Sequence, residues 1–421
     1  MHKFYITNNL GGGGTNVSRF VDYKQLFDLQ NIGLLLNYYY LSGKVKIKFD
    51  TTLLKELEKF DNIAEFLNYA KKWFADNRSV SASFKQNLKP TNINGYMLDN
   101  GCGNILRDLL QSGKYTTKAV RNLVEPFHDF SESLNFDFSI ALDYATKYTY
   151  KDNENADSQM KKLWQELAGN EKINLSLIDT TLSVKKLKNY NHKIYAPLHG
   201  FDYDSFEDYL NAVIKAEKQQ KTKFDGFALG GIADSKKLPN AIWNVPKGIT
   251  KELKIGYIVS KLCQKVCKII DRPLHVLGAG NIYVFPFIIN SGATSSDCHS
   301  AWRRASDGGF DKAKILVPLL NDKLEFINSK YTLKYVHIKN INNSYAFDCG
   351  YTISTLKKLY KSISKEDFYF GEILAFYQAV KQYDLLIRFT EKYPDYLNRL
   401  CKTPDSELNE SYCKLIEKLK L

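Results

Sequence analysis

Short apolar runs alternate along the chain with longer amphipathic stretches, in the order expected for strands and helices. The runs predicted as strands cover residues 4–7, 32–40, 95–99, 136–143, 193–200, 224–233 and 274–280. Apolar residues recur every three to four positions in the stretches predicted as helices, at 52–76, 105–111, 117–132, 206–219 and 249–270. Pro126 predicts a break in the third of these helices. The alternation predicts repeated βαβ units and therefore a parallel sheet.

The strand count and the way the strands end favour one architecture over another. We expect an α/β fold, a (β/α)8 TIM-type barrel with helical insertions and a helical C-terminal extension; a doubly wound open sheet is the alternative. Beyond about residue 350 only helical patterns follow. This predicts a barrel over residues 1–350 and a helical part, packed on the barrel, over residues 351–421.

Composition and charge narrow the class of protein and of partner. The chain has 421 residues, 44% of them hydrophobic, which is enough for a large core. Lys and Arg outnumber Asp and Glu by 59 to 46, a formal charge of +13 that favours a polyanion, nucleic acid before an acidic membrane. A general bias toward lysine explains the same excess equally well.

Cysteine usage and the lack of long apolar runs predict the compartment. The seven cysteines are an odd number and are scattered, which indicates reduced thiols. No export signal is recognisable, and no apolar run is long enough to span a bilayer. We therefore expect a cytoplasmic protein without a membrane partner.

Three of the predicted strands end close to an aspartate. Asp99 follows Met97 and Leu98, and Asp297 stands between Ser296 and Cys298. The third is Asp143, although Asp137 lies on the same run and competes with it. A barrel gathers the carboxyl ends of its strands at one rim, where such carboxylates serve acid, base or nucleophilic chemistry. The alternative for any one aspartate is a turn or helix N-cap residue.

Taken in order, the predicted strand ends form a recognisable set. They are Leu98-Asp99-Asn100-Gly101, Ala141-Leu142-Asp143, Pro197-Leu198-His199-Gly200, Leu229-Gly230-Gly231-Ile232-Ala233, Val276-Leu277-Gly278-Ala279-Gly280 and Ser296-Asp297-Cys298. Over about residues 95–304 this set resembles the tRNA-guanine transglycosylase superfamily, and most of all its DNA-guanine transglycosylases, which insert 7-deazaguanine into DNA. The resemblance implies a pentosyltransferase that exchanges a base through a covalent aspartyl-glycosyl intermediate and needs no cofactor.

The resemblance also assigns roles to single residues. Asp297 takes the position of the nucleophile, and Asp99 that of the general acid/base. The residues that match the base-binding positions are Asp143, His199, Gly230, Gly231 and Leu277. A histidine bonded to backbone in the core is the alternative reading of His199.

A basic cluster follows the proposed nucleophile. Trp302, Arg303 and Arg304 are close behind Asp297, and arginine is otherwise scarce in this chain. We interpret the three as nucleic-acid contacts, with plain surface charge as the alternative.

The sequence departs from the tRNA enzymes at three points. His199 replaces a glutamine that contacts the deazaguanine substituent, and Gly103 replaces an aromatic that stacks on the base, a role that Tyr144 could take over. Only Cys349 remains of the cysteines that hold a structural zinc, so neither zinc nor another metal is expected.

These departures set the expected partners. DNA is the expected substrate, with a free 7-deazaguanine base, 7-cyano-7-deazaguanine in the first instance, and accessory DNA-modification proteins as further partners. The alternatives are a tRNA-guanine transglycosylase and, in another class, a non-catalytic nucleic-acid-binding subunit on the same barrel. The presence of both Asp99 and Asp297 favours an enzyme.

Overall fold

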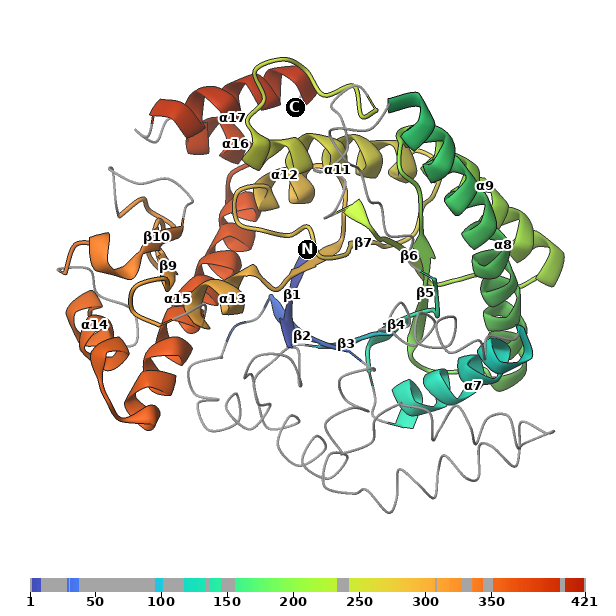
Figure 1. Cartoon of the computed structure of the whole chain (residues 1–421), viewed down its shortest axis with the longest axis horizontal. Coiled ribbons are helices and arrows are strands. Elements are labelled where there is room, and N and C mark those ends of the chain that lie inside the picture. The colour runs from blue at the N-terminus through green and yellow to red at the C-terminus, as the bar shows by residue number, and fades with distance from the viewer. Residues whose placement is uncertain are drawn as a thin grey trace.

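The chain forms a closed barrel of eight parallel strands surrounded by helices (Figure 1), which confirms the predicted (β/α)8 TIM-type fold. The computed structural model describes residues 2–8, 29, 31–37, 95–100, 117–133, 136–144, 156–232, 242–306, 309–327, 335–343, 351–401 and 406–419. The strands are β1 (Lys3–Asn8), β2 (Ile32–Asn37), β3 (Tyr96–Asp99), β4 (Phe138–Ile140), β5 (Lys193–Leu198), β6 (Gly226–Leu229), β7 (Leu274–Val276) and β8 (Ser295–Cys298). Pairing of β8 with β1 closes the barrel, with Asp297 in register with Tyr5.

Helices cover the outside of the barrel. Those that accompany the strands are α7 (Thr117–Ser133), α8 (Ala156–Lys188), α9 (Tyr203–Gln220), α11 (Lys251–Cys267), α12 (Phe285–Asn290) and α13 (Ser300–Ser306). A two-stranded sheet of β9 (Lys314–Leu316) and β10 (Tyr335–His337) and the 3-10 helix η2 (Ile338–Asn340) come next. The C-terminal part then contains α14 (Ile353–Lys361), α15 (Lys365–Lys392), α16 (Tyr396–Cys401) and α17 (Ser406–Leu419).

Two sequence predictions within this frame are wrong in detail. Helix α7 continues through Pro126 without ending there, because its buried face, with Val124 and Phe127, packs on the core. Strand β7 ends at Val276 instead of reaching Gly280, because Gly278 adopts a left-handed backbone with φ of +67°. The predicted helices at 52–76 and 105–111 lie outside the described residues.

The barrel interior is filled by large side chains set against glycines. Its buried residues are Tyr5, Leu35, Met97, Phe138, Ile140, Tyr195 and Ala228, with Leu277 packed against them. A Cβ atom on Gly33 would lie 2.5 Å from the Tyr5 ring, and one on Gly226 would lie 2.8 Å from the Tyr195 ring. Glycine at these positions therefore makes room for aromatic rings inside the barrel.

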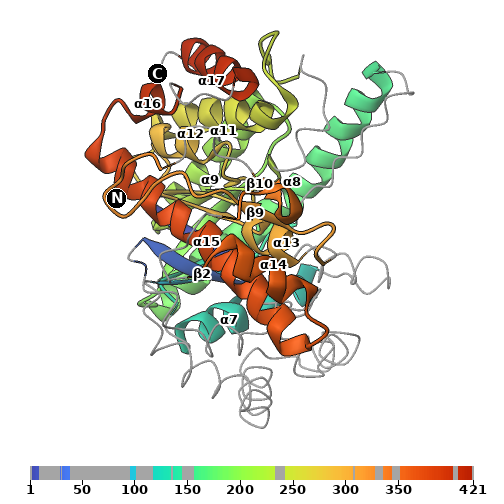
Figure 2. The ribbon, with the colours of Figure 1, turned by 90° about the vertical axis from the view of Figure 1, so that its left-hand side faces the viewer.

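The C-terminal helices share one hydrophobic core with the barrel. Helix α15 crosses in front of β2 in Figure 2. Its Tyr383 ring stacks on Phe4 of β1 at 3.9 Å between centroids, and its Asp384 carboxylate accepts two hydrogen bonds from Asn31 at 3.1 Å. The described helices include none that is both long and apolar enough to cross a membrane.

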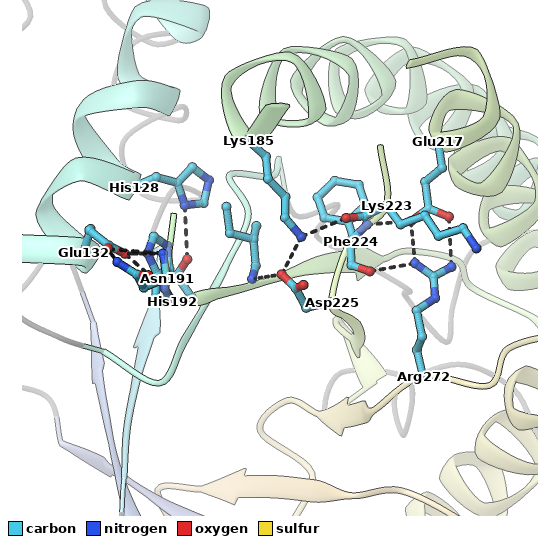
Figure 3. Close-up of polar contacts among 12 residues, drawn as sticks. His128, Glu132, Lys185, Asn191, His192, Glu217, Lys223, Phe224, Asp225 and Arg272 are labelled. Carbon is cyan, nitrogen blue, oxygen red and sulfur yellow. Dashed lines mark hydrogen bonds and ion pairs between the residues drawn. The ribbon is translucent and has the colours of Figure 1, made fainter. Parts of the chain in front are cut away.

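Polar contacts tie the amino-terminal ends of β5 and β6 to the surrounding helices (Figure 3). The Asp225 carboxylate accepts hydrogen bonds from Lys185 at 2.6 Å and from the Ile194 N–H at 2.8 Å. The guanidinium of Arg272 donates hydrogen bonds to both oxygens of the buried Glu217 carboxylate, at 2.6 and 2.9 Å. These contacts lie at the end of the barrel where residues usually serve stability.

Candidate active site

Strand β8 consists of four polar or weakly polar residues that are all buried. Inside a protein such groups need hydrogen-bond partners, and each has one here. The outward-facing pair is Ser296, within 3.1 Å of His2, and Cys298, whose thiol contacts the Ser300 hydroxyl at 2.8 Å. Ser295 and Asp297 face the barrel interior, in step with the inward-facing Tyr5.

Three groups, two from β7 and the turn after it and one from β1, converge on the Asp297 carboxylate. Its Oδ1 accepts a hydrogen bond from the Gly278 N–H at 2.8 Å and lies 3.2 Å from His275 Nε2. Its Oδ2 accepts a hydrogen bond from the Thr7 hydroxyl at 2.8 Å. The side chain is 6% exposed. Charge-assisted hydrogen bonds of this kind fix both the position and the rotation of a carboxylate.

Two glycines after β7 explain the Gly-x-Gly pattern of the sequence. The left-handed backbone at Gly278 turns its N–H toward Asp297. The N–H of Gly280 donates to the Asp297 carbonyl at 3.0 Å, and a Cβ there would lie 2.8 Å from that same oxygen. Both glycines therefore shape the surroundings of Asp297, and their N–H groups donate to its carboxylate and to its carbonyl oxygen.

Sequence reasoning missed His275 and Ser295 as members of the site. His275 is fully buried in the interior, with Nδ1 2.8 Å from the Ser295 hydroxyl and Nε2 facing Asp297. Since an ionised aspartate oxygen only accepts, Nε2 is the donor in this contact. The available signal was a histidine in the middle of a buried strand, which needs a polar partner.

A second carboxylate stands on another part of the same rim. Asp143, three residues beyond β4, accepts a hydrogen bond from the Asn100 side-chain N–H at 2.8 Å and lies 2.9 Å from His199 Nε2. Asn100 also donates to the Ala141 carbonyl at 2.7 Å. Asp137 is at the opposite end of β4, 3.7 Å from the Lys3 ammonium, so it does not belong to this cluster.

The remaining predicted residues lie at neighbouring strand ends. Asp99 is the last residue of β3 and is half-buried. Gly230 and Gly231 follow β6; at Gly231 φ is +72°, and in the part of the chain that the structure describes no atom beyond its chain neighbours lies within 4 Å of where a Cβ would be. Leu277, after β7, is half-buried against the interior residues. The structure therefore places the predicted catalytic and base-binding residues at the carboxyl ends of β3 to β8.

Helix α13 carries the predicted nucleic-acid contacts just beyond this rim. Arg303 and Arg304 are exposed on it, and Trp302 is one of its residues. Burial raises the pKa of the neighbouring Cys298 thiol to about 11, against the opposing effect of its hydrogen bonds with Ser300. A thiol this hard to ionise is a poor nucleophile at neutral pH.

One cavity lies apart from this rim. It has a volume of about 680 Å³ and opens at the opposite, amino-terminal mouth of the barrel, where Lys3, Glu132 and Lys193 contribute to its wall.

Among the described residues no group of three or more His, Cys, Asp or Glu side chains is arranged to hold a metal ion. Gly103 and Cys349, on which the predicted departures from the tRNA enzymes depend, lie outside those residues.

Comparison of the sequence with models of known protein families gives no match, and neither does comparison with curated proteins. The function of the chain therefore has to be argued from its own residues and geometry.

Proposed function

We propose that this chain is a base-exchanging glycosyltransferase, a DNA-guanine transglycosylase in which Asp297 is the nucleophile. One observation carries the proposal: a buried carboxylate at the carboxyl rim of a (β/α)8 barrel is held by three groups, two from β7 and the turn after it and one from β1, and has one lightly bonded oxygen among the described residues. Barrel enzymes place their reacting groups at this rim. A carboxylate fixed in position is the nucleophile that double displacement at a sugar carbon requires.

The donors distinguish the two oxygens of Asp297. Among the described residues, Oδ1 has two neighbours, the Gly278 N–H and His275, whereas Oδ2 has one, the Thr7 hydroxyl. Oδ2 therefore keeps a lone pair for attack on C1′ of a deoxyguanosine. The C1′–N9 bond breaks, its electron pair leaves with the guanine, and Asp99 donates the proton that the departing base takes up.

The second half of the reaction reverses the first. Asp99, now ionised, removes the N9 proton from the incoming 7-deazaguanine, and that nitrogen attacks C1′. The ester bond to Asp297 breaks and the carboxylate is regenerated. Two displacements return the sugar to its original configuration, and the exchange consumes neither ATP nor a redox cofactor.

Asp143 is suited to hold the base. An ionised carboxylate oxygen accepts more than one hydrogen bond, so Asp143 can accept from the N–H groups of a guanine while Asn100 holds it in place. His199 Nε2 lies 2.9 Å from the other carboxylate oxygen, Oδ2. The open space beside Gly231 leaves room for a planar base to approach the backbone. A duplex nucleotide reaches such a site only after flipping out of the stack.

The test is base exchange with purified protein and labelled guanine, measured separately on duplex DNA and on unmodified tRNA. We expect label in DNA, lost in Asp297→Asn and in Asp99→Asn. Label in tRNA alone would assign the runner-up substrate. No label in either, with tight DNA binding, would refute an enzyme and favour a binding subunit.

A further inference from the structure

A surface beside the candidate site holds a large share of the positive charge of the protein. We call it the basic surface and define it by eight residues: Arg303, Arg304, Lys312, Lys314, Lys339, Lys357, Lys358 and Lys361. Within residues 300–306, 309–314, 335–343 and 351–363 the one acidic residue is Asp311, while Asp367 follows at the start of α15 and accepts a hydrogen bond from Ser362 at 2.8 Å. These short segments thus carry +7 of the +13 formal charge of the whole chain.

Three contacts join these segments into one continuous surface. The Lys357 ammonium donates to the Ile341 carbonyl at 2.9 Å and so ties α14 to the end of η2. The Lys361 ammonium lies 4.6 Å from the centroid of the Phe310 ring, ahead of β9. The Tyr360 hydroxyl donates to the Ala305 carbonyl, which fastens α14 to α13. Figures 1 and 2 both show α13, α14, β9 and β10 grouped on one side of the barrel.

Two of the cations on this surface, Lys357 and Lys361, lie close enough to affect each other. Burial and the nearby Lys361 lower the pKa of Lys357, so adjacent ammonium groups repel. Lys339, Lys358 and Lys361 are exposed, and no ion pair with an acidic side chain is found for them within the described part of the chain. An anionic partner would relieve this repulsion and release its own counterions.

We propose that the basic surface docks the phosphate backbone of the nucleic-acid substrate and delivers the flipped nucleotide to Asp297. The proposal rests on the function proposed above and assigns the docking to β9, β10, η2 and α14, which lie outside the barrel. Helix α13 starts two residues after Cys298, so the surface begins at the strand that carries Asp297. Closely spaced cations along a surface are the feature that tracks a polyphosphate backbone without reading its sequence.

The test is binding of a fluorescent 30-base-pair DNA by anisotropy over a series of salt concentrations. The variant is Lys339→Gln/Lys358→Gln/Lys361→Gln. The matched control removes three other surface lysines, Lys215→Gln/Lys218→Gln/Lys268→Gln, on and just after helices α9 and α11. We expect the first variant to bind at least about tenfold more weakly near 0.1 M salt, with a log–log salt slope smaller by about 2 to 3. The control should bind like the wild type.

Two results would overturn the proposal: equal binding by variant and control, or a loss of binding to anionic phosphatidylglycerol vesicles with DNA affinity unchanged. The anisotropy assay measures DNA binding and needs no reaction. Failure of the docking proposal is therefore distinguishable from failure of the proposed base exchange. A weak-binding variant that still exchanges guanine at saturating DNA would support both proposals. A wild type that binds DNA through this surface but exchanges nothing would uphold the docking surface and refute the enzyme.

Discussion

Replacing His275 with phenylalanine tests how Asp297 is held. The imidazole is fully buried and packs edge-on against Tyr5 and Phe138, with centroids 5.9 and 5.8 Å away. Phenylalanine keeps a ring of similar size in that place but removes the donor that lies 3.2 Å from Asp297 Oδ1. The carboxylate then keeps the Gly278 and Thr7 donors and can rotate.

The size of the effect follows from the lost contact. A hydrogen bond to a charged group contributes about 1.5–3 kcal/mol. If that contribution orients the nucleophile, its loss lowers kcat on the order of 10- to 100-fold, at about 1.4 kcal/mol per factor of ten. KM for the free base should stay unchanged, because His275 touches Asp297 and not the proposed base-binding cluster.

The matched control is His2→Phe. His2 is also buried and also bonds a serine of β8, but its partner is Ser296, which faces away from the interior. Both variants should lower the melting temperature, and only His275→Phe should lower kcat. Equal kcat values in His275→Phe and the wild type, or equal losses in both variants, would refute the positioning role.

Three further predictions concern stability and the shape of the site. Burial lowers the pKa of His2 to about 4 in the folded protein, whereas in the unfolded chain it returns to about 6.5. Between pH 7 and pH 5 the unfolded chain therefore binds a proton that the folded protein does not. The free energy of unfolding of the wild type should fall by about 2 kcal/mol from this source over that range. His2→Gln should show a correspondingly flatter dependence in urea titrations, and an unchanged slope would contradict this. Arg272→Ala strands the buried Glu217 carboxylate and should cost about 3–5 kcal/mol, without changing kcat of the folded enzyme; a neutral effect in urea unfolding would show that the pair is not needed. Gly280→Ala brings a methyl group to 2.8 Å from the Asp297 carbonyl and should reduce exchange activity more than Gly230→Ala, whose nearest neighbour is 3.6 Å away; the reverse order would contradict the steric argument.

The sequence was sufficient for the fold because its signal is local and repeated. The predicted strands alternate with helices and account for most of an eightfold barrel, so a doubly wound sheet was the one alternative left to the structure; the closure by β8 onto β1 was visible only there. Boundaries were less predictable where packing outweighs propensity. Pro126 inside α7 is the clearest case, since the buried face of that helix compensates for the lost hydrogen bond.

The site was predictable only as far as its residues stand at strand ends. Asp297 and Asp143 could be found in this way, because parallel strands bring their carboxyl ends to one rim. Thr7 could not, since its contact with Asp297 spans 290 positions and exists only once β8 pairs with β1. Asn100 stands beside a recognised aspartate, but the sequence assigned it no role; its hydrogen bond to Asp143 forms because β3 pairs with β4.

The central claim is that Asp297 forms a covalent bond to the sugar, and the direct test is to isolate that adduct. The wild type is incubated with a duplex that contains one guanine, denatured in acid, digested and analysed by mass spectrometry. The account predicts that the peptide containing Asp297 gains the mass of the oligonucleotide strand that has lost its guanine base. Added 7-deazaguanine should remove this adduct, and Asp297→Asn should show none. Base exchange without an adduct, or an adduct on any other residue, would contradict it.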